Sequence, residues 1–128
     1  MPESHLQTPP TSVLFVEDDP LVRRFVIEAL VDEGYAAEPA ASADEARAMM
    51  DRTRYDVLMT DIMLPRGQSG FALAAWAARR QPDLRIIYTS GLPAAAEHRM
   101  VARGSYLEKP FGARRLISSI EAATARRC

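Results

Sequence analysis

Charged and hydroxyl side chains follow four separate apolar runs of the sequence. Glu17 and Asp18 come after the first run, Asp61 after a central one, and Thr89 and Lys109 end two later ones. Carboxylates gathered in a small volume raise one another's pKa, and a hard divalent cation such as Mg²⁺ relieves that repulsion. Lysine and threonine suit phosphoryl oxygens. Together these residue types favour phosphoryl transfer onto a carboxylate.

Each of these residues, taken alone, also has an ordinary structural explanation. Asp61 could cap or break a turn before Pro65. Acids at 17–19 could simply open a helix, whose dipole favours negative charge there, and Thr89 could be no more than the end of a strand. The functional interpretation depends on their joint placement, because each group ends a different predicted strand.

The elements that must position these residues alternate along the chain. Apolar runs of strand type occur at Val13–Val16, Tyr35–Pro39, Val57–Met59, Ile86–Thr89 and Tyr106–Glu108. Helical patterns occupy the intervals, at Pro20–Glu33, Ser42–Arg52, Phe71–Gln81 and, more weakly, Ala94–Arg103, and a last one surrounds Leu116–Ala123. Five repeats of strand then helix predict an α/β fold, a doubly wound parallel sheet with right-handed crossovers and helices on both faces. Its strand ends would share one edge.

The first helix carries the clearest local signals. Asp19 suits its N-cap, Pro20 its first position and Gly34 the position just after its end. An apolar stripe predicts the buried side of this helix; its members are Leu21, Val22, Phe25, Val26, Ala29 and Leu30.

Composition excludes several classes of protein. The chain has 128 residues, 48% of them apolar, and a net charge of −1, so a single domain is expected and no strong attraction to nucleic acid or anionic membranes. No apolar run approaches the roughly 18 residues of a membrane span. Residues 1–11 are polar, and we expect them to form a flexible tail before a domain that spans residues 12–126. The single cysteine, Cys128, permits no internal disulfide and fits a reducing compartment.

Four motifs, together with Gly70, carry a family resemblance across nearly the whole chain. They are Val13–Pro20, Asp61–Pro65, Thr89–Gly91 and Tyr106–Phe111. The sequence resembles a response-regulator receiver domain of the CheY-like superfamily, the phosphoacceptor module of two-component signalling, in its single-domain form. The resemblance implies a flavodoxin-like, five-stranded parallel sheet in the strand order 2-1-3-4-5.

The resemblance also implies a role for each acidic residue. Asp61 would accept the phosphoryl group, and Asp18 would bind Mg²⁺ directly, with Glu17 acting through water. The backbone carbonyl of Met63 would complete the protein's metal ligands, and Asp19 falls on a variable position where an N-cap role is preferred.

The remaining motif residues would respond to the phosphoryl group. Thr89 would hydrogen-bond it, Lys109 would pair with it, and a cis Lys109–Pro110 peptide bond would aim that lysine. Tyr106 matches the aromatic residue that changes rotamer on activation; by itself, a packed aromatic is the ordinary explanation.

The implied partners are proteins. A histidine kinase or a histidine phosphotransfer protein would supply the phosphoryl group in the cytoplasm, and an unknown downstream protein would read the change. The reading face would comprise the helix at Ala94–Arg103, the strand at Tyr106–Glu108 and the last helix. Direct nucleic-acid or membrane binding is not expected. The domain would catalyse its own phosphorylation and dephosphorylation without being a classical enzyme.

Two departures from the family pattern and three alternatives stay open. The loop Arg66–Ser69 is one residue longer than the commonest pattern, and the segment between Thr89 and Lys109 is short for a helix with its loops. A phosphatase or hydrolase of the haloacid-dehalogenase type would need an aspartate where Met63 stands. A flavodoxin-like cofactor binder would need a Ser-, Thr- and Gly-rich loop after the first strand. A degenerate receiver, acting only as a scaffold, is opposed by the intact set of motif residues.

Overall fold

The structure is a computed structural model that describes residues 9–91 and 104–125. Within these residues, five strands and four α-helices follow one another. They are β1 (Ser12–Val16), α1 (Pro20–Asp32), β2 (Ala36–Ala40), α2 (Ala43–Arg52), β3 (Val57–Asp61), α3 (Gly70–Arg80), β4 (Arg85–Ser90), β5 (Gly104–Glu108) and α4 (Ala113–Thr124). The helix expected at Ala94–Arg103 lies outside the described residues, as does most of the expected tail.

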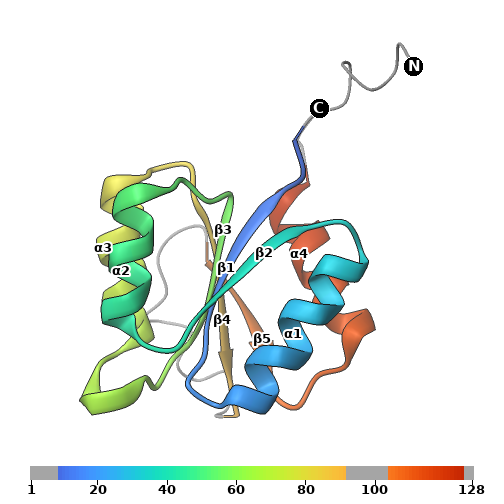
Figure 1. Cartoon of the computed structure of the whole chain (residues 1–128), viewed down its shortest axis with the longest axis horizontal. Helices are drawn as coiled ribbons and strands as arrows, with labels where there is room; N and C mark the ends of the chain where they lie inside the picture. Colours follow the sequence, from blue (N-terminus) through green and yellow to red (C-terminus); the bar gives the residue numbers. More distant parts are fainter. Residues whose placement is uncertain (1–8, 92–103, 126–128) are drawn as a thin grey trace.

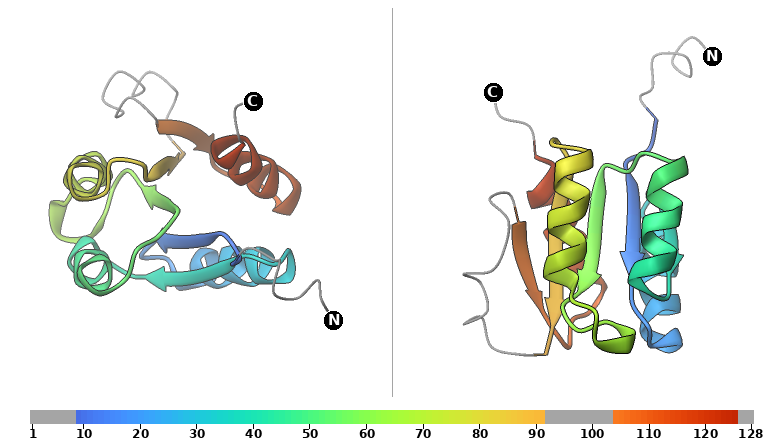
Figure 2. Two further views of the ribbon diagram at one scale, coloured as in Figure 1. Left: turned by 90° about the horizontal axis from the view of Figure 1, so that it is seen from above. Right: turned by 90° about the vertical axis from the view of Figure 1, so that its left-hand side faces the viewer.

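All five strands run parallel in one sheet, in the order β2-β1-β3-β4-β5. This confirms the doubly wound α/β fold and the implied strand order. Helices α2 and α3 cover one face of the sheet, and α1 and α4 cover the other (Figures 1 and 2). Among the described helices, none is long and apolar enough to cross a membrane.

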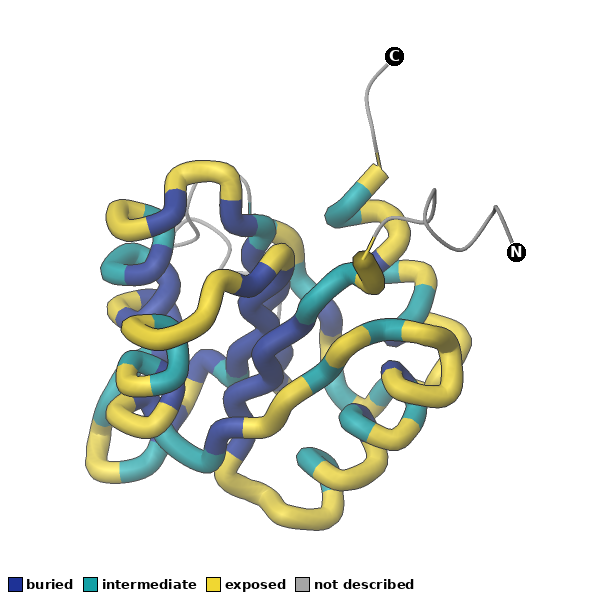
Figure 3. The backbone as a smooth tube through the Cα atoms, turned by 45° about the horizontal axis from the view of Figure 1, so that its top comes forward, coloured by how far each residue is buried: buried dark blue, intermediate teal, exposed yellow. Residues whose placement is uncertain are grey.

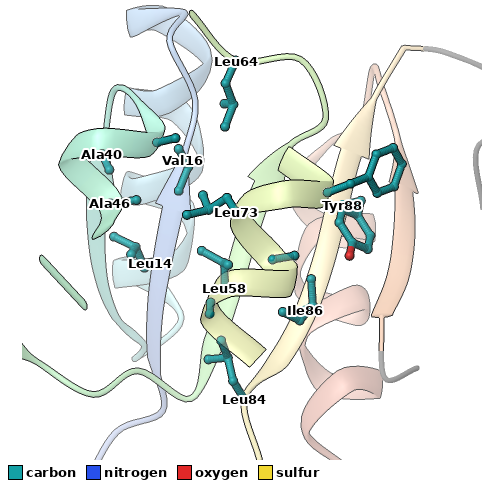
Figure 4. Packing of buried hydrophobic residues seen from close by; sticks show 14 of the residues in the cluster. Leu14, Val16, Ala40, Ala46, Leu58, Leu64, Leu73, Leu84, Ile86 and Tyr88 are labelled. Carbon is teal, nitrogen blue, oxygen red and sulfur yellow. The ribbon is translucent and has the colours of Figure 1, made fainter. Parts of the chain in front are cut away.

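The core consists of two apolar layers, one on each face of the central strands. Along β1, Val13 and Phe15 point to the layer under α1 and α4, whereas Leu14 and Val16 point to the layer under α2 and α3. This alternation is the two-residue period of a strand whose faces are both buried. The most buried backbone therefore runs through the middle of the sheet (Figure 3), and Figure 4 shows the layer that includes Leu14, Leu58, Leu73 and Ile86.

The ends of helix α1 are as the sequence predicts. Asp19 is the N-cap, and its carboxylate accepts the backbone N–H of Leu21 at 2.9 Å. At the other end, Gly34 has a φ of 96° and its N–H donates to the carbonyl of Val31, while the N–H of Tyr35 donates to the carbonyl of Leu30. Both bonds satisfy carbonyls that the helix leaves without intrahelical partners.

The predicted buried stripe of α1 is wrong at two positions. Val26 and Leu30 are fully buried, but Leu21 is 77% exposed and Phe25 is 42% exposed. The apolar side of α1 is wider than the part of its surface that packs against the sheet. Leu21 and Phe25 instead line an apolar groove with Pro110 and Phe111.

Strand β3 ends at Asp61, as the sequence predicts. Two other strand limits differ from the sequence prediction. Strand β5 begins at Gly104, earlier than Tyr106, and β2 ends at Ala40. The strand order confirms the edge position expected for β2. This position suits Pro39, because proline has no backbone N–H to donate to a neighbouring strand.

Tyr55 gives a stability prediction at the opposite end of β3. Its side chain is 2% exposed, and its hydroxyl donates to Glu38 Oε1 at 2.5 Å. Burial, reinforced by the Glu38 carboxylate, raises the pKa of Tyr55 above the ordinary value of 10.0. The folded state therefore holds the phenol proton where the unfolded state releases it, so stability is fully present below pH 10.0 and falls above it.

We expect Tyr55→Phe to lower the free energy of unfolding by about 1 kcal/mol at neutral pH, because the hydrogen bond is lost. Without a titrating phenol, the variant loses less stability above pH 10.0, so the difference from wild type narrows. Urea unfolding of both proteins at neutral and alkaline pH measures this. A difference that stays constant with pH would contradict the assignment.

Candidate functional site

The predicted site residues meet at the carboxyl edge of the sheet. Glu17 and Asp18 follow β1, and Asp61 ends β3. Thr89 on β4 is the registered neighbour of Asp61. Glu17, Asp18 and Asp61 each offer a carboxylate oxygen, and these three atoms all lie within 4.8 Å of one another. The parallel topology thus brings together groups that are far apart in the sequence.

Lys109 joins this cluster from the end of β5. Its Nζ donates to Glu17 Oε1 at 2.8 Å and to Asp61 Oδ2 at 3.2 Å. Its backbone N–H donates to the carbonyl of Ser90 at 2.8 Å, which ties the residue to β4. The Lys109–Pro110 peptide bond is cis, the isomer that the resemblance implies.

Burial and charge act in opposite directions on this cluster. Burial raises the pKa of Glu17, and the hydrogen bond from Lys109 partly offsets that rise. For Lys109, burial lowers the pKa, but the hydrogen bond to Glu17 and the nearby charge of Asp61 outweigh it, so the net shift is upward. The ammonium group of Lys109 therefore remains charged at neutral pH.

The acidic residues fit a hard divalent cation. Glu17 is 1% exposed, and its second carboxylate oxygen accepts the N–H of Asp19 at 3.1 Å. Asp18 is exposed, and within the described part of the chain its carboxylate accepts no hydrogen bond. Mg²⁺ binds carboxylate oxygens and keeps several water ligands, so it suits a cluster of carboxylates that is partly exposed to solvent. The donor set is compatible with Mg²⁺.

The Thr89 hydroxyl is a buried polar group in the same site. The residue is fully buried, and its Oγ1 has no hydrogen-bond partner among the residues that the structure describes. A buried hydroxyl without a partner costs free energy. Because Thr89 is the neighbour of Asp61 in the sheet, a group attached to Asp61 would be a suitable hydrogen-bond partner for this hydroxyl. Tyr106 lies further out, half-buried on β5, with its hydroxyl donating to the carbonyl of Ser90 at 3.4 Å.

The loop from β3 to α3 is held by several backbone contacts. Met63 pairs with Ser69 in an antiparallel bridge, and the N–H of Leu64 donates to the carbonyl of Gln68 at 3.0 Å. Between them, Pro65–Gly67 form a short 3₁₀ turn in which Arg66 has a φ of 60°. Met63 is 67% exposed. The role predicted for this residue involves only its backbone carbonyl and not its side chain.

Sequence reasoning missed Arg23. Its Nη1 donates to the carbonyl of Glu17 at 2.9 Å and to the carbonyl of Asp18 at 3.3 Å. The only sequence signal was a basic residue one turn into a helix that begins directly after acids. That signal is weak, because Arg24 beside it has the same type and makes a surface ion pair with Glu28.

Comparisons with known proteins agree with this geometry. The sequence model of the response regulator receiver domain matches residues 13–121. The chain is 32% identical over 112 residues to the response regulator receiver protein CpdR of Brucella abortus, covering 85% of this chain and 92% of that protein. It is 30% identical to the sensor kinase CckA of the same organism, covering 86% of this chain but 12% of the kinase. The high-resolution structure of the chemotaxis response regulator CheY4 of Vibrio cholerae superposes with a TM-score of 0.80 at 28% identity, covering 89% of this chain and 98% of CheY4.

Proposed function

The chain belongs to the response regulator receiver domain family, and from this premise we propose that it is a phosphoacceptor of two-component signalling. In this proposal Asp61 receives a phosphoryl group from a phosphohistidine of a histidine kinase or phosphotransfer protein in the cytoplasm. The receiver domain is assigned to residues 12–126. One observation carries the proposal: a single ammonium group, Lys109, bonds both Asp61 and the buried Glu17 at an edge crowded with carboxylates.

The proposed reaction moves one phosphoryl group between two protein side chains. An Asp61 carboxylate oxygen attacks phosphorus in line, forming the new oxygen–phosphorus bond. The phosphorus–nitrogen bond to the donor imidazole breaks, and its electron pair stays on the imidazole. Bound Mg²⁺, held by Asp18, Asp61, the Met63 carbonyl and, through water, Glu17, would neutralise charge on the phosphoryl oxygens. The domain contributes mainly by positioning.

Lys109 and Thr89 then respond to the added charge. A phosphoryl group adds about −1.5 to −2 charges, so Lys109 gains a stronger partner than the Asp61 carboxylate. The Thr89 hydroxyl gains a hydrogen bond that none of the described residues provides. Movement of Thr89 toward the phosphoryl group leaves space into which Tyr106 turns. The surface around β5 and α4 shifts from its inactive to its active conformation. This shift requires that the phosphoryl group stabilise the active conformation over the inactive one by a few kcal/mol. Hydrolysis of the aspartyl phosphate resets the domain.

Similar proteins support the choice of partner class. CpdR is a receiver protein of nearly this length, and CckA is a sensor kinase to which this chain corresponds over 12% of its length. A domain of this kind therefore occurs both alone and within a kinase. The proposed upstream partner is accordingly a sensor histidine kinase or a phosphotransfer protein, and the downstream partner is a protein that binds the phosphorylated form.

A small acyl phosphate tests the chemistry without a kinase. With Mg²⁺ present, we expect intact-mass spectrometry at short time points to show one added phosphoryl group on the wild-type protein. With a metal chelator present, the adduct should be absent, because the carboxylates would then repel the donor. Release of inorganic phosphate without an adduct at any time would favour a hydrolase, and neither adduct nor release would favour a scaffold.

A further inference from the structure

Arg23 contacts the acidic loop through the backbone of the loop, whereas Lys109 contacts the carboxylates of Glu17 and Asp61. It lies in the first turns of α1, and one guanidinium nitrogen donates to the carbonyls of two successive residues, Glu17 and Asp18. These are the residues whose carboxylates, with that of Asp61, form the acidic cluster. Arg23 touches none of these carboxylates, so its contact is with the backbone that carries them.

The loop needs such a contact because it joins three acids in sequence. The Asp19 carboxylate is occupied as the N-cap of α1, and the Asp19 carbonyl accepts the backbone N–H of Arg23 at 2.9 Å. Glu17 and Asp18 have no such role in the helix, and their like charges repel. A donor fixed to both of their carbonyls holds the two peptide planes, and these planes set the directions of the two side chains.

The half-buried position of Arg23 distinguishes it from its neighbour. Arg24 is the next residue on the same helix, yet its side chain is 77% exposed and pairs with Glu28 in solvent. The two arginines thus have the same charge and nearly the same place in the chain. They differ in whether they bond to the acidic loop, which makes Arg24 a matched control.

We propose that Arg23 is a positioning residue for the metal site. It holds the backbone of Glu17 and Asp18 so that their carboxylates converge with Asp61 on a divalent cation. The proposal rests on the function proposed above. Arg23 acts through the backbone and takes no part in the bonds that form or break at phosphorus.

The sign of the effect separates positioning from simple charge. A positive charge near a cation site repels the cation, so removing Arg23 would tighten Mg²⁺ binding if its charge were all that mattered. Removing a group that orients the ligands weakens binding, in proteins generally by about 10- to 100-fold. The two effects oppose each other, and we expect positioning to dominate because both hydrogen bonds go directly to ligand residues.

The test is calorimetric titration of the full chain with MgCl₂ alone. Arg23→Met keeps an unbranched aliphatic stem and a similar helix propensity but removes the guanidinium group, and we expect it to weaken Mg²⁺ binding about tenfold. Arg24→Met should bind as wild type does. Arg23→Lys, which retains one nitrogen donor, should recover part of the affinity. Thermal unfolding of each variant without metal checks that the fold is intact, and Arg23→Gln replaces Arg23→Met if the latter does not fold.

The outcomes separate this inference from the proposed function. If wild type binds no Mg²⁺, the metal site itself is wrong. If wild type binds and Arg23→Met binds equally or more tightly, the metal site stands and Arg23 does not position it. Equal weakening by Arg23→Met and Arg24→Met would also overturn the inference, since Arg24 does not contact the loop.

Discussion

Asp61→Asn is expected to abolish the phosphoryl adduct while leaving the protein folded. Asparagine has nearly the same shape as aspartate, but its amide lacks the nucleophilic carboxylate oxygen that forms the acyl phosphate. Lys109 loses one of its two acidic partners and keeps the closer one, Glu17, at 2.8 Å. The expected change is therefore chemical, and we expect a loss of more than about 100-fold in the rate of adduct formation. Intact-mass spectrometry with a small acyl phosphate and Mg²⁺ measures it.

Asp56→Asn is the matched control for this experiment. It makes the same chemical change just before the other end of β3, where Asp56 is exposed and accepts hydrogen bonds from Ser12. The control variant should gain the phosphoryl group as wild type does. An equal adduct on Asp61→Asn would show that another residue is modified, and loss of the adduct in both variants would show that the rate depends on overall charge or folding.

The sequence predicts the site because a parallel sheet converts spacing along the chain into proximity. Once the strands are placed, their carboxyl ends must share an edge, and this argument brings Glu17, Asp61 and Lys109 together without any knowledge of side-chain positions. The structure supplies what the argument leaves open. It shows that Lys109 bridges the two acids and that Glu17 is almost completely buried.

Features that depend on long-range packing are beyond the same reasoning. The apolar stripe of α1 includes Leu21 and Phe25, yet both are exposed, because the width of a buried face depends on where the sheet and α4 end. Arg23 is likewise unpredictable, since nothing in the sequence distinguishes it from Arg24 until the helix is placed over the acidic loop. Helical periodicity identifies a side of a helix and leaves its contacts undetermined.

Gly70→Ala should be the most destabilising of these substitutions. Gly70 begins α3, and its N–H donates to the carbonyl of Ile62 at 2.7 Å. A Cβ atom at this position would lie 2.1 Å from the backbone carbonyl oxygen of Asp61. The Cβ position is fixed by the backbone of residue 70, and its partner is a backbone oxygen, so no side-chain rotation can relieve the contact. Either the start of α3 or the end of β3 must move. We expect the free energy of unfolding to fall by about 3 kcal/mol, as in severe overpacking.

Gly91→Ala isolates this clash from the general effect of replacing glycine. A Cβ at Gly91 meets no heavy atom of the residues that the structure describes within 4 Å, and the residue is exposed, so its substitution should change stability by less than about 1 kcal/mol. Urea unfolding of both variants gives the comparison. Because the atom displaced in Gly70→Ala belongs to the proposed acceptor residue, the fraction that remains folded should also accept phosphate more slowly, whereas Gly91→Ala should keep most of the wild-type rate. If Gly70→Ala were as stable as Gly91→Ala, the expected clash with the Asp61 carbonyl oxygen would not occur. Asp61 would then be positioned by its strand and not by its close contact with the start of α3.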